Sequence, residues 1–256
     1  MSIIQGTGRG GARRFYDFPI EQSLRFDGSS YLSFTPSSNT NSGLWTYSVW
    51  VKLSNFGDGL LLGASPSSWQ SDMRFGGTLQ FFDDGGRNFN VESSMLFRDT
   101  SAFYHIVAVV NSSLSNASDR IKIYVNGSLV TYSVSAQAFA GTDVTGGATK
   151  YNNSSYAMRI GGRSSSSVVL NGYLANIQFI DGQALDASYF GETKDDIWIP
   201  KTFDGTSSTG GSTVSTDYGT NGFLLDFSSI SGTTINDTAP IDTNHSSANN
   251  WTATGF

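Results

Sequence analysis

The acidic residues that could form a catalytic pair are scattered along the sequence. Glu21, Glu92 and Glu192 each stand alone, whereas glycoside hydrolysis needs two carboxyl groups roughly 5 to 9 Å apart. On one face of a strand, that separation corresponds to residues two positions apart. We therefore expect no enzyme activity, unless the fold brings carboxylates together from distant strands.

The two histidines are also poorly placed for nucleophilic or metal chemistry. His105 follows Tyr104 within a strongly apolar stretch, which is typical of a structural histidine, and His245 lies in a polar tail. A nucleophile–histidine system needs the histidine beside its nucleophile, and a histidine metal site needs ligands at a regular spacing. Cysteine is absent, so thiolate ligands and disulfides are excluded as well.

Aromatic side chains beside amides indicate where a sugar could bind. A sugar ring packs its CH face on an aromatic side chain, while amides bind its hydroxyls. Such residues gather in and just after a long polar segment, residues 136–155, and one more aromatic lies in a second polar stretch. The predicted glycan-binding residues are Trp69, Tyr151, Asn152, Asn153 and Tyr156. The alternative is that these side chains only pack their own loops.

The first twenty residues differ from the rest of the chain. They are rich in glycine and carry clustered arginines followed at once by aromatic residues. Guanidinium and aromatic groups together are typical of an anchor on a partner protein. The predicted partner-docking residues of this extended arm, residues 1–20, are Arg9, Arg13, Arg14, Phe15 and Tyr16. The alternative is a terminus that lies on its own domain.

The remaining residues, 21–256, show the alternation of strands. Residues 45–53 place Trp45, Tyr47 and three aliphatic residues on one face, and Thr46, Ser48, Trp50 and Lys52 on the other. Many short strands separated by turns predict an all-β protein, a two-sheet antiparallel β-sandwich. We assign both tryptophans to strand packing. One short helix is predicted near 186–190, and a polar tail is predicted beyond residue 228.

Composition and charge exclude several classes of partner. The 256 residues suit one large domain, and only 14% of them are charged. A net charge of −6 argues against nucleic acid, which requires a basic face. No apolar run is long enough for a membrane-spanning helix, so we expect no membrane partner. The first residues lack the pattern of a signal peptide, which predicts synthesis in the cytoplasm.

Several motifs, taken in order, carry a resemblance to a known family. They are residues 23–32, residues 45–52, the Phe-Tyr-His-Ile-Val of 103–107, the Ile-Tyr-Val-Asn-Gly of 123–127, and the Gly-x-Leu-Ala-x-Ile-x-Phe of 172–179. Together they resemble laminin-G-like, concanavalin-A-like jelly-roll domains. The resemblance covers roughly residues 21–190 and implies the same sandwich fold with a jelly-roll topology.

The family resemblance also implies sites to look for. Its hydrolases carry a Glu-x-Asp-x-x-Glu pattern, which is missing here, so a glycoside hydrolase is the least favoured function. Its relatives often hold Ca²⁺ through Asp and Asn oxygens. Candidates for calcium are Asp83 with Asp84, or Asp195 with Asp196. Asp-Gly clusters more often form plain turns, and we therefore assign no cofactor and no metal site.

A narrower resemblance suggests where the protein acts. Residues 97–107, 179–186, 218–223 and 249–252 look like a version found in tailed-phage structural proteins, notably marine ones. This implies a virion protein, as capsid decoration, head appendage or tail-fibre component, that docks on other virion proteins and forms homo-oligomers. The alternative function is a glycan-binding adhesin for host-surface polysaccharide.

Overall fold

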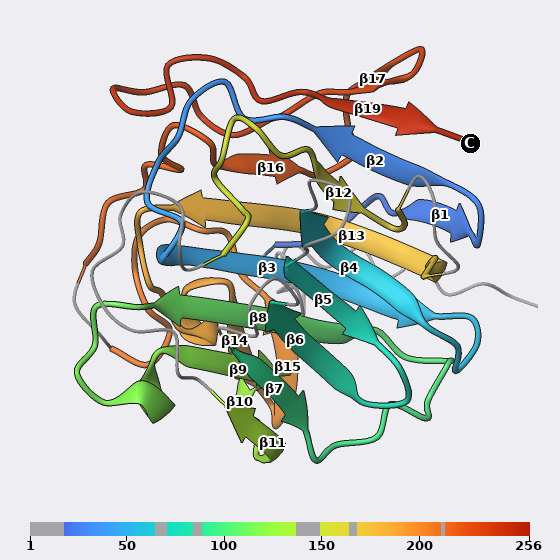
Figure 1. Cartoon of the computed structure of the whole chain (residues 1–256), viewed down its shortest axis with the longest axis vertical. Helices are drawn as coiled ribbons and strands as arrows, with labels where there is room; N and C mark the ends of the chain where they lie inside the picture. The colour runs from blue at the N-terminus through green and yellow to red at the C-terminus, as the bar shows by residue number, and fades with distance from the viewer. Residues whose placement is uncertain (1–17, 65–70, 84–88, 137–148, 164–167, 211–212) are drawn as a thin grey trace, which may run out of the picture.

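A computed structural model describes residues 18–64, 71–83, 89–136, 149–163, 168–210 and 213–256. The predicted antiparallel sandwich is confirmed, because two large sheets lie face to face (Figure 1). The predicted arm residues Arg9, Arg13, Arg14, Phe15 and Tyr16, together with Trp69 and Asp84, lie outside the described residues. In the part that is described, no helix is long and apolar enough to cross a membrane.

The first sheet has seven strands. Six run in the spatial order β1-β13-β3-β8-β9-β10, and β16 pairs with β13 beside them. The strands are β1 (Leu24–Asp27), β13 (Asn171–Asp181), β3 (Leu44–Leu53), β8 (Tyr104–Asn111), β9 (Ile121–Val125), β10 (Ser128–Leu129) and β16 (Phe223–Leu225).

The second sheet has ten strands in the spatial order β11-β7-β6-β5-β4-β12-β2-β19-β18-β17. They are β11 (Tyr132–Ala136), β7 (Asn90–Ser93), β6 (Leu79–Asp83), β5 (Ser71–Phe75), β4 (Gly59–Ala64), β12 (Met158–Ile160), β2 (Tyr31–Phe34), β19 (Trp251–Thr254), β18 (Thr234–Ile235) and β17 (Ile230–Ser231). A separate hairpin joins β14 (Gly191–Lys194) to β15 (Ile197–Pro200), and two short 3-10 helices, η1 (Ala117–Asp119) and η2 (Ala187–Tyr189), complete the fold. The second of these confirms the short helix predicted near residues 186–190.

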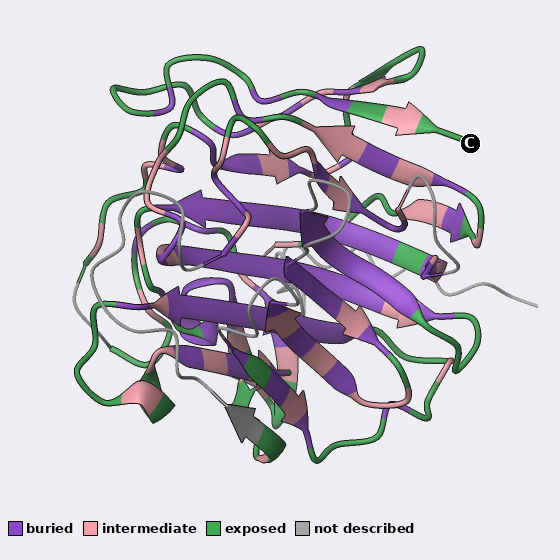
Figure 2. Cartoon of the chain, in the orientation of Figure 1, coloured by how far each residue is buried: buried purple, intermediate pink, exposed green. Residues whose placement is uncertain are grey.

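The main core lies between the two sheets. Strand β3 sends Trp45, Tyr47 and Val49 into it, as the alternation predicted, and all three are fully buried. Strand β8 is apolar on both faces. Ile106 and Ala108 face this core, whereas Val107 and Val109 face the other side of the sheet. Figure 2 shows β3, β8 and β13 buried along most of their length.

A second apolar layer covers the outer face of the seven-stranded sheet. Val107, Val109 and Ile180 pack there against Leu185, Phe190 and other residues that follow β13 in the chain. Burying apolar side chains on both faces of one sheet removes them from water and stabilises that sheet. The second layer therefore explains why the outer face of β3, which the sequence shows as mixed, is largely buried.

The predicted polar tail beyond residue 228 is partly built into the second sheet. Strand β19 pairs with β2 on one side and with β18 on the other. Its Trp251 is fully buried and lies edge-on to the Phe223 ring at 4.8 Å. His245, which lies in this polar tail, is buried, and its Nε2 lies 3.0 Å from an oxygen of Asp237.

Candidate functional site

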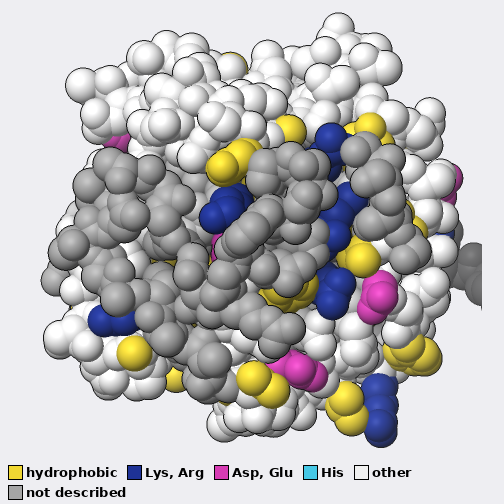
Figure 3. Space-filling view, in the orientation of Figure 1, with side chains coloured by type: hydrophobic (Ala, Val, Ile, Leu, Met, Phe, Trp, Pro, Cys, Tyr) yellow, Lys and Arg dark blue, Asp and Glu magenta, His cyan; other side chains and the backbone are white. Residues whose placement is uncertain are grey.

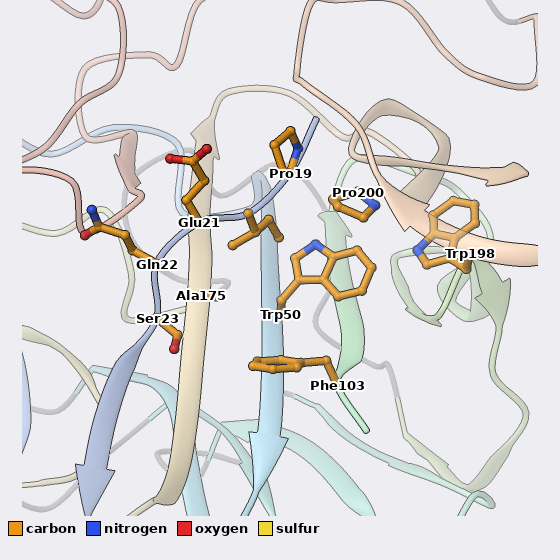
Figure 4. Close-up of a pocket in the computed structure, with 10 residues that line it drawn as sticks. Pro19, Glu21, Gln22, Ser23, Trp50, Phe103, Ala175, Trp198 and Pro200 are labelled. Carbon is orange, nitrogen blue, oxygen red and sulfur yellow. The ribbon is translucent and has the colours of Figure 1, made fainter. Parts of the chain in front are cut away.

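A pocket opens on the outer face of the seven-stranded sheet, beside the β14–β15 hairpin (Figure 4). Its volume is about 360 Å³, within the size range of small-molecule sites. The lining residues come from the chain before β1, from β3, β13 and β15, and from the residue before β8. They are Pro19, Ile20, Glu21, Gln22, Ser23, Trp50, Phe103, Ala175, Trp198 and Pro200.

Trp50 forms the centre of the pocket because of its place in the sheet. In the register of the strands it lies opposite Ala175 on β13 and opposite His105 on β8. The small side chain of Ala175 leaves space beside the indole, and the ring of His105 supports it from the other side. Figure 4 shows the Trp50 ring between Phe103 and Pro200.

His105 links the two tryptophans of the site. Its ring stacks on Trp50 with centroids 4.6 Å apart. The Trp198 Nε1–H donates to its Nδ1 at 2.9 Å. An indole nitrogen can only donate, so Nδ1 accepts and the ring proton sits on Nε2, which donates to Ser48 Oγ at 2.8 Å.

Burial keeps His105 neutral. Its ring is almost completely covered, and this desolvation lowers the pKa of His105 to about 3. Both ring nitrogens are used within the protein, so no lone pair remains for a metal or a substrate. The interpretation of His105 as a structural histidine thus agrees with its contacts, and its role is to fix the two indoles relative to each other.

Trp198 is held in place by two glycines. A Cβ added to Gly127 would lie 2.5 Å from the indole, and one added to Gly191 would lie 2.4 Å from it. Both distances are far below a normal carbon–carbon contact. The indole therefore packs directly on two backbones, while part of it remains exposed at the pocket.

The polar flank of the pocket consists of Glu21, Gln22 and Ser23, which are exposed and lead into β1. Figure 4 shows Glu21 and Gln22 on the side of Trp50 opposite Trp198. Glu21 is the one ionisable side chain among the described residues that line this pocket. Aromatic faces on one side and hydrogen-bonding groups on the other can hold a ring that is apolar on its face and polar at its edge.

Of the predicted glycan-binding residues, the four that the structure describes do not line this pocket. The prediction that Tyr151 and Asn152 are displayed to a ligand was wrong, because both are buried. The Tyr151 hydroxyl lies 3.0 Å from the carbonyl oxygens of Leu62 and Ser71, and its ring packs edge-on against Trp45. Asn153 and Tyr156 are partly buried near the start of β12, and their glycan role stays a prediction.

A second, polar pocket brings two carboxylates together from distant segments. Asp181 and Asp217 both line it, and burial raises the pKa of Asp181 to about 6. Asp181 accepts hydrogen bonds from the Thr40 hydroxyl at 2.8 Å, the Asn221 backbone at 3.1 Å and the Asn152 amide at 2.9 Å. This carboxylate therefore ties three loops together.

The calcium candidates lie in two different settings. Asp83 is buried on β6, where Ser71 Oγ donates to it at 2.8 Å and Lys150 Nζ lies 3.8 Å away. Asp195 and Asp196 form the tip of the β14–β15 hairpin, with φ angles of 50° and 63°. Within the described ranges, no three His, Cys, Asp or Glu side chains gather as metal ligands.

Sequence reasoning did not single out Trp198 and assigned Trp50 to packing. One signal was available for Trp50, since it stands on the face of residues 45–53 that otherwise carries Thr, Ser and Lys. A large aromatic residue on a polar face indicates a second layer or a binding surface. No comparable signal marks Trp198, because its partners His105 and Gly127 are distant in sequence.

Comparison with known proteins gives one family and several similar structures. A family model described as the concanavalin A-like lectin/glucanases superfamily matches residues 26–188. A SAP-like pentraxin from Limulus polyphemus is 16% identical with a TM-score of 0.45, covering 66% of this chain and 79% of the pentraxin. Domain 4 of the arabinanase AbnA from Geobacillus stearothermophilus, solved with arabinotriose, is 14% identical with a TM-score of 0.47, covering 66% and 75%.

Domains LG4-5 of the mouse laminin alpha1 chain are 16% identical with a TM-score of 0.45. This match covers 64% of the chain described here and 43% of the laminin fragment. No curated protein matches the chain in sequence.

Proposed function

The chain belongs to the concanavalin A-like lectin/glucanases superfamily, and we propose that it is a carbohydrate-binding module that holds a sugar at the Trp50–Trp198 pocket. The observation that carries this proposal is the buried His105, which fixes two indoles at a pocket flanked by Glu21 and Gln22. Rigid aromatic side chains lose little entropy when they bind a ligand. A neutral sugar with one apolar face fits this arrangement.

Phe103 offers the cleanest test, because 39% of its side chain is exposed while it lines the pocket. Binding partners are first identified on a glycan array, and the best glycan is then titrated by calorimetry. We expect Phe103→Ala to weaken binding by about three- to tenfold, the usual value of one aromatic contact. Trp198→Ala should weaken glycan binding further, because this variant also removes the hydrogen bond that holds the His105 ring.

Phe56→Ala is the control, since Phe56 is also an exposed phenylalanine, at 58%, but does not line the pocket. It should bind the glycan like the unmodified protein. If the Phe103 and Phe56 variants bind the glycan with equal affinity and all melting temperatures are unchanged, the glycan does not bind in this pocket.

We further propose that the module is displayed on a phage virion, docked through the arm on other virion proteins. This proposal rests on the sequence resemblance alone, and capsid decoration, head appendage and tail fibre are equally compatible with it. Mass spectrometry of purified virions is the test. A high copy number that survives low-salt and chelator washes is expected, and absence from the particles would end the proposal.

A further inference from the structure

A third pocket lies on the outer face of the ten-stranded sheet, where β12, β2 and β19 run side by side. Its volume is about 530 Å³. The register of the strands places Arg159 opposite Ser33, and Ser33 opposite Thr252. Residues opposite each other in neighbouring strands point to the same face, so these three side chains form a row across the pocket floor, away from the buried Leu32 and Met158.

Arg159 is the charged group of this row. Its guanidinium lies over the Tyr31 ring, 5.0 Å from the ring centre. No carboxylate of the described ranges pairs with it, and its Nη1 is buried without a hydrogen-bond partner. A buried donor without an acceptor is unfavourable. The guanidinium therefore has donor capacity that the described residues do not use.

The rest of the described lining supplies neutral donors and no carboxylate. Hydroxyls come from Ser33, Thr35, Ser247 and Thr252. The Asn250 side-chain oxygen accepts the Asp237 backbone N–H at 2.9 Å, which leaves its NH₂ group as a donor. In a chain with 21 acidic and 15 basic residues, a polar pocket with a cation and without an acid is selective for negative charge.

Figure 3 views the molecule onto this sheet and shows Lys and Arg side chains gathered over its middle. We propose that this pocket binds an anionic sugar, one that carries a carboxylate or a sulfate group. The grounds are the row of Arg159, Ser33 and Thr252, the guanidinium without a carboxylate partner, and the surrounding hydroxyls. Arginine binds both groups through paired, charge-assisted hydrogen bonds. The site lies on the opposite sheet from the Trp50–Trp198 pocket and does not depend on it.

The test uses two matched pairs of oligosaccharides and the full chain. An oligogalacturonate is compared with its methyl ester, and a sulfated galactan oligosaccharide with its unsulfated form, by calorimetry at low salt. We expect at least one anionic form to bind about tenfold more tightly than its neutral partner, with the difference shrinking as salt is added. The pair that responds identifies the anionic group.

Variants then assign the charge effect to Arg159. Arg159→Gln should abolish the preference for the anionic form, and Arg159→Lys should retain part of it. Arg25→Gln is the matched control, because the Arg25 guanidinium also lies over a tyrosine, Tyr173, at 5.2 Å, but on the other sheet. Phe103→Ala should leave the preference intact, which separates this site from the aromatic pocket.

Two results would overturn the proposal. One is equal binding of the anionic and neutral forms by the unmodified protein. The other is an unchanged preference in a folded Arg159→Gln variant, because the charge recognition would then lie elsewhere.

Discussion

At the residue scale, Asp181 connects buried hydrogen bonds to pH. Its pKa of about 6 lies above the ordinary value of 3.8, so the folded state binds the proton more tightly than the unfolded state. Asp181 therefore increases the free energy of unfolding below about pH 4, and this contribution is lost as pH rises through 6. Two pKa units correspond to on the order of 3 kcal/mol.

Asp181→Asn should remove this pH dependence. We expect the stability of the unmodified protein, relative to the variant, to fall by a few kcal/mol between about pH 4 and pH 7. Urea unfolding at several pH values measures the difference, and the exposed Asp58→Asn serves as control. Parallel pH profiles for the unmodified protein and Asp181→Asn would contradict the assignment.

His105 acts in the opposite direction over much of the same range. Its pKa, lowered to about 3 by burial, means that the unfolded state takes up a proton first as pH falls. The contribution of neutral His105 to the free energy of unfolding is complete above about pH 6.5 and is lost as pH falls towards 3. The total pH profile is a sum of both effects, so the effect of Asp181 is isolated only by comparing the unmodified protein with the variant.

At the element scale, the β14–β15 hairpin positions Trp198 through its contact with Gly191. Gly191 has no positive φ, so its backbone accepts alanine, and the effect of a substitution comes from the 2.4 Å approach of the new Cβ to the indole. We expect Gly191→Ala to displace Trp198, to lower the unfolding free energy by about 1 to 3 kcal/mol and to weaken glycan binding.

The measurements for Gly191→Ala are urea unfolding and the same glycan titration. Gly57→Ala is the control, because its Cβ would make only an ordinary contact, 3.5 Å from Asn55. If Gly191→Ala binds and unfolds like the unmodified protein, Trp198 does not depend on this packing.

At the scale of the whole molecule, the sandwich was predictable where patterns are local. The alternation of residues 45–53 and the doubly apolar β8 determine which side chains meet in the core. The C-terminal strands were missed because β17 and β18 have only two residues each, and because β19 pairs with β2, which is distant in sequence. Tyr151 was misplaced because its polar neighbours suggested exposure, whereas its hydroxyl is satisfied by two buried carbonyls.

The candidate site was less predictable than the fold. Trp50 could be assigned to the outer face of its strand from alternation alone, but its pocket depends on Ala175, Phe103 and Trp198. These side chains come together only through sheet register and through a hairpin that is separate from both sheets. Arg159 carried no sequence signal, since a single arginine in a short strand is ordinary.

The pairing of β19 with β2 has a consequence for how the chain is made. Strand β2 ends at residue 34, and the neighbour that completes this side of its ladder begins at residue 251. A ribosome releases residues in order, at roughly 5 to 20 per second, so this edge of β2 stays open while residues 35–250 are made. Contacts so distant in sequence also slow folding. Until β19 emerges, this edge of the nascent chain is available for pairing with other nascent chains.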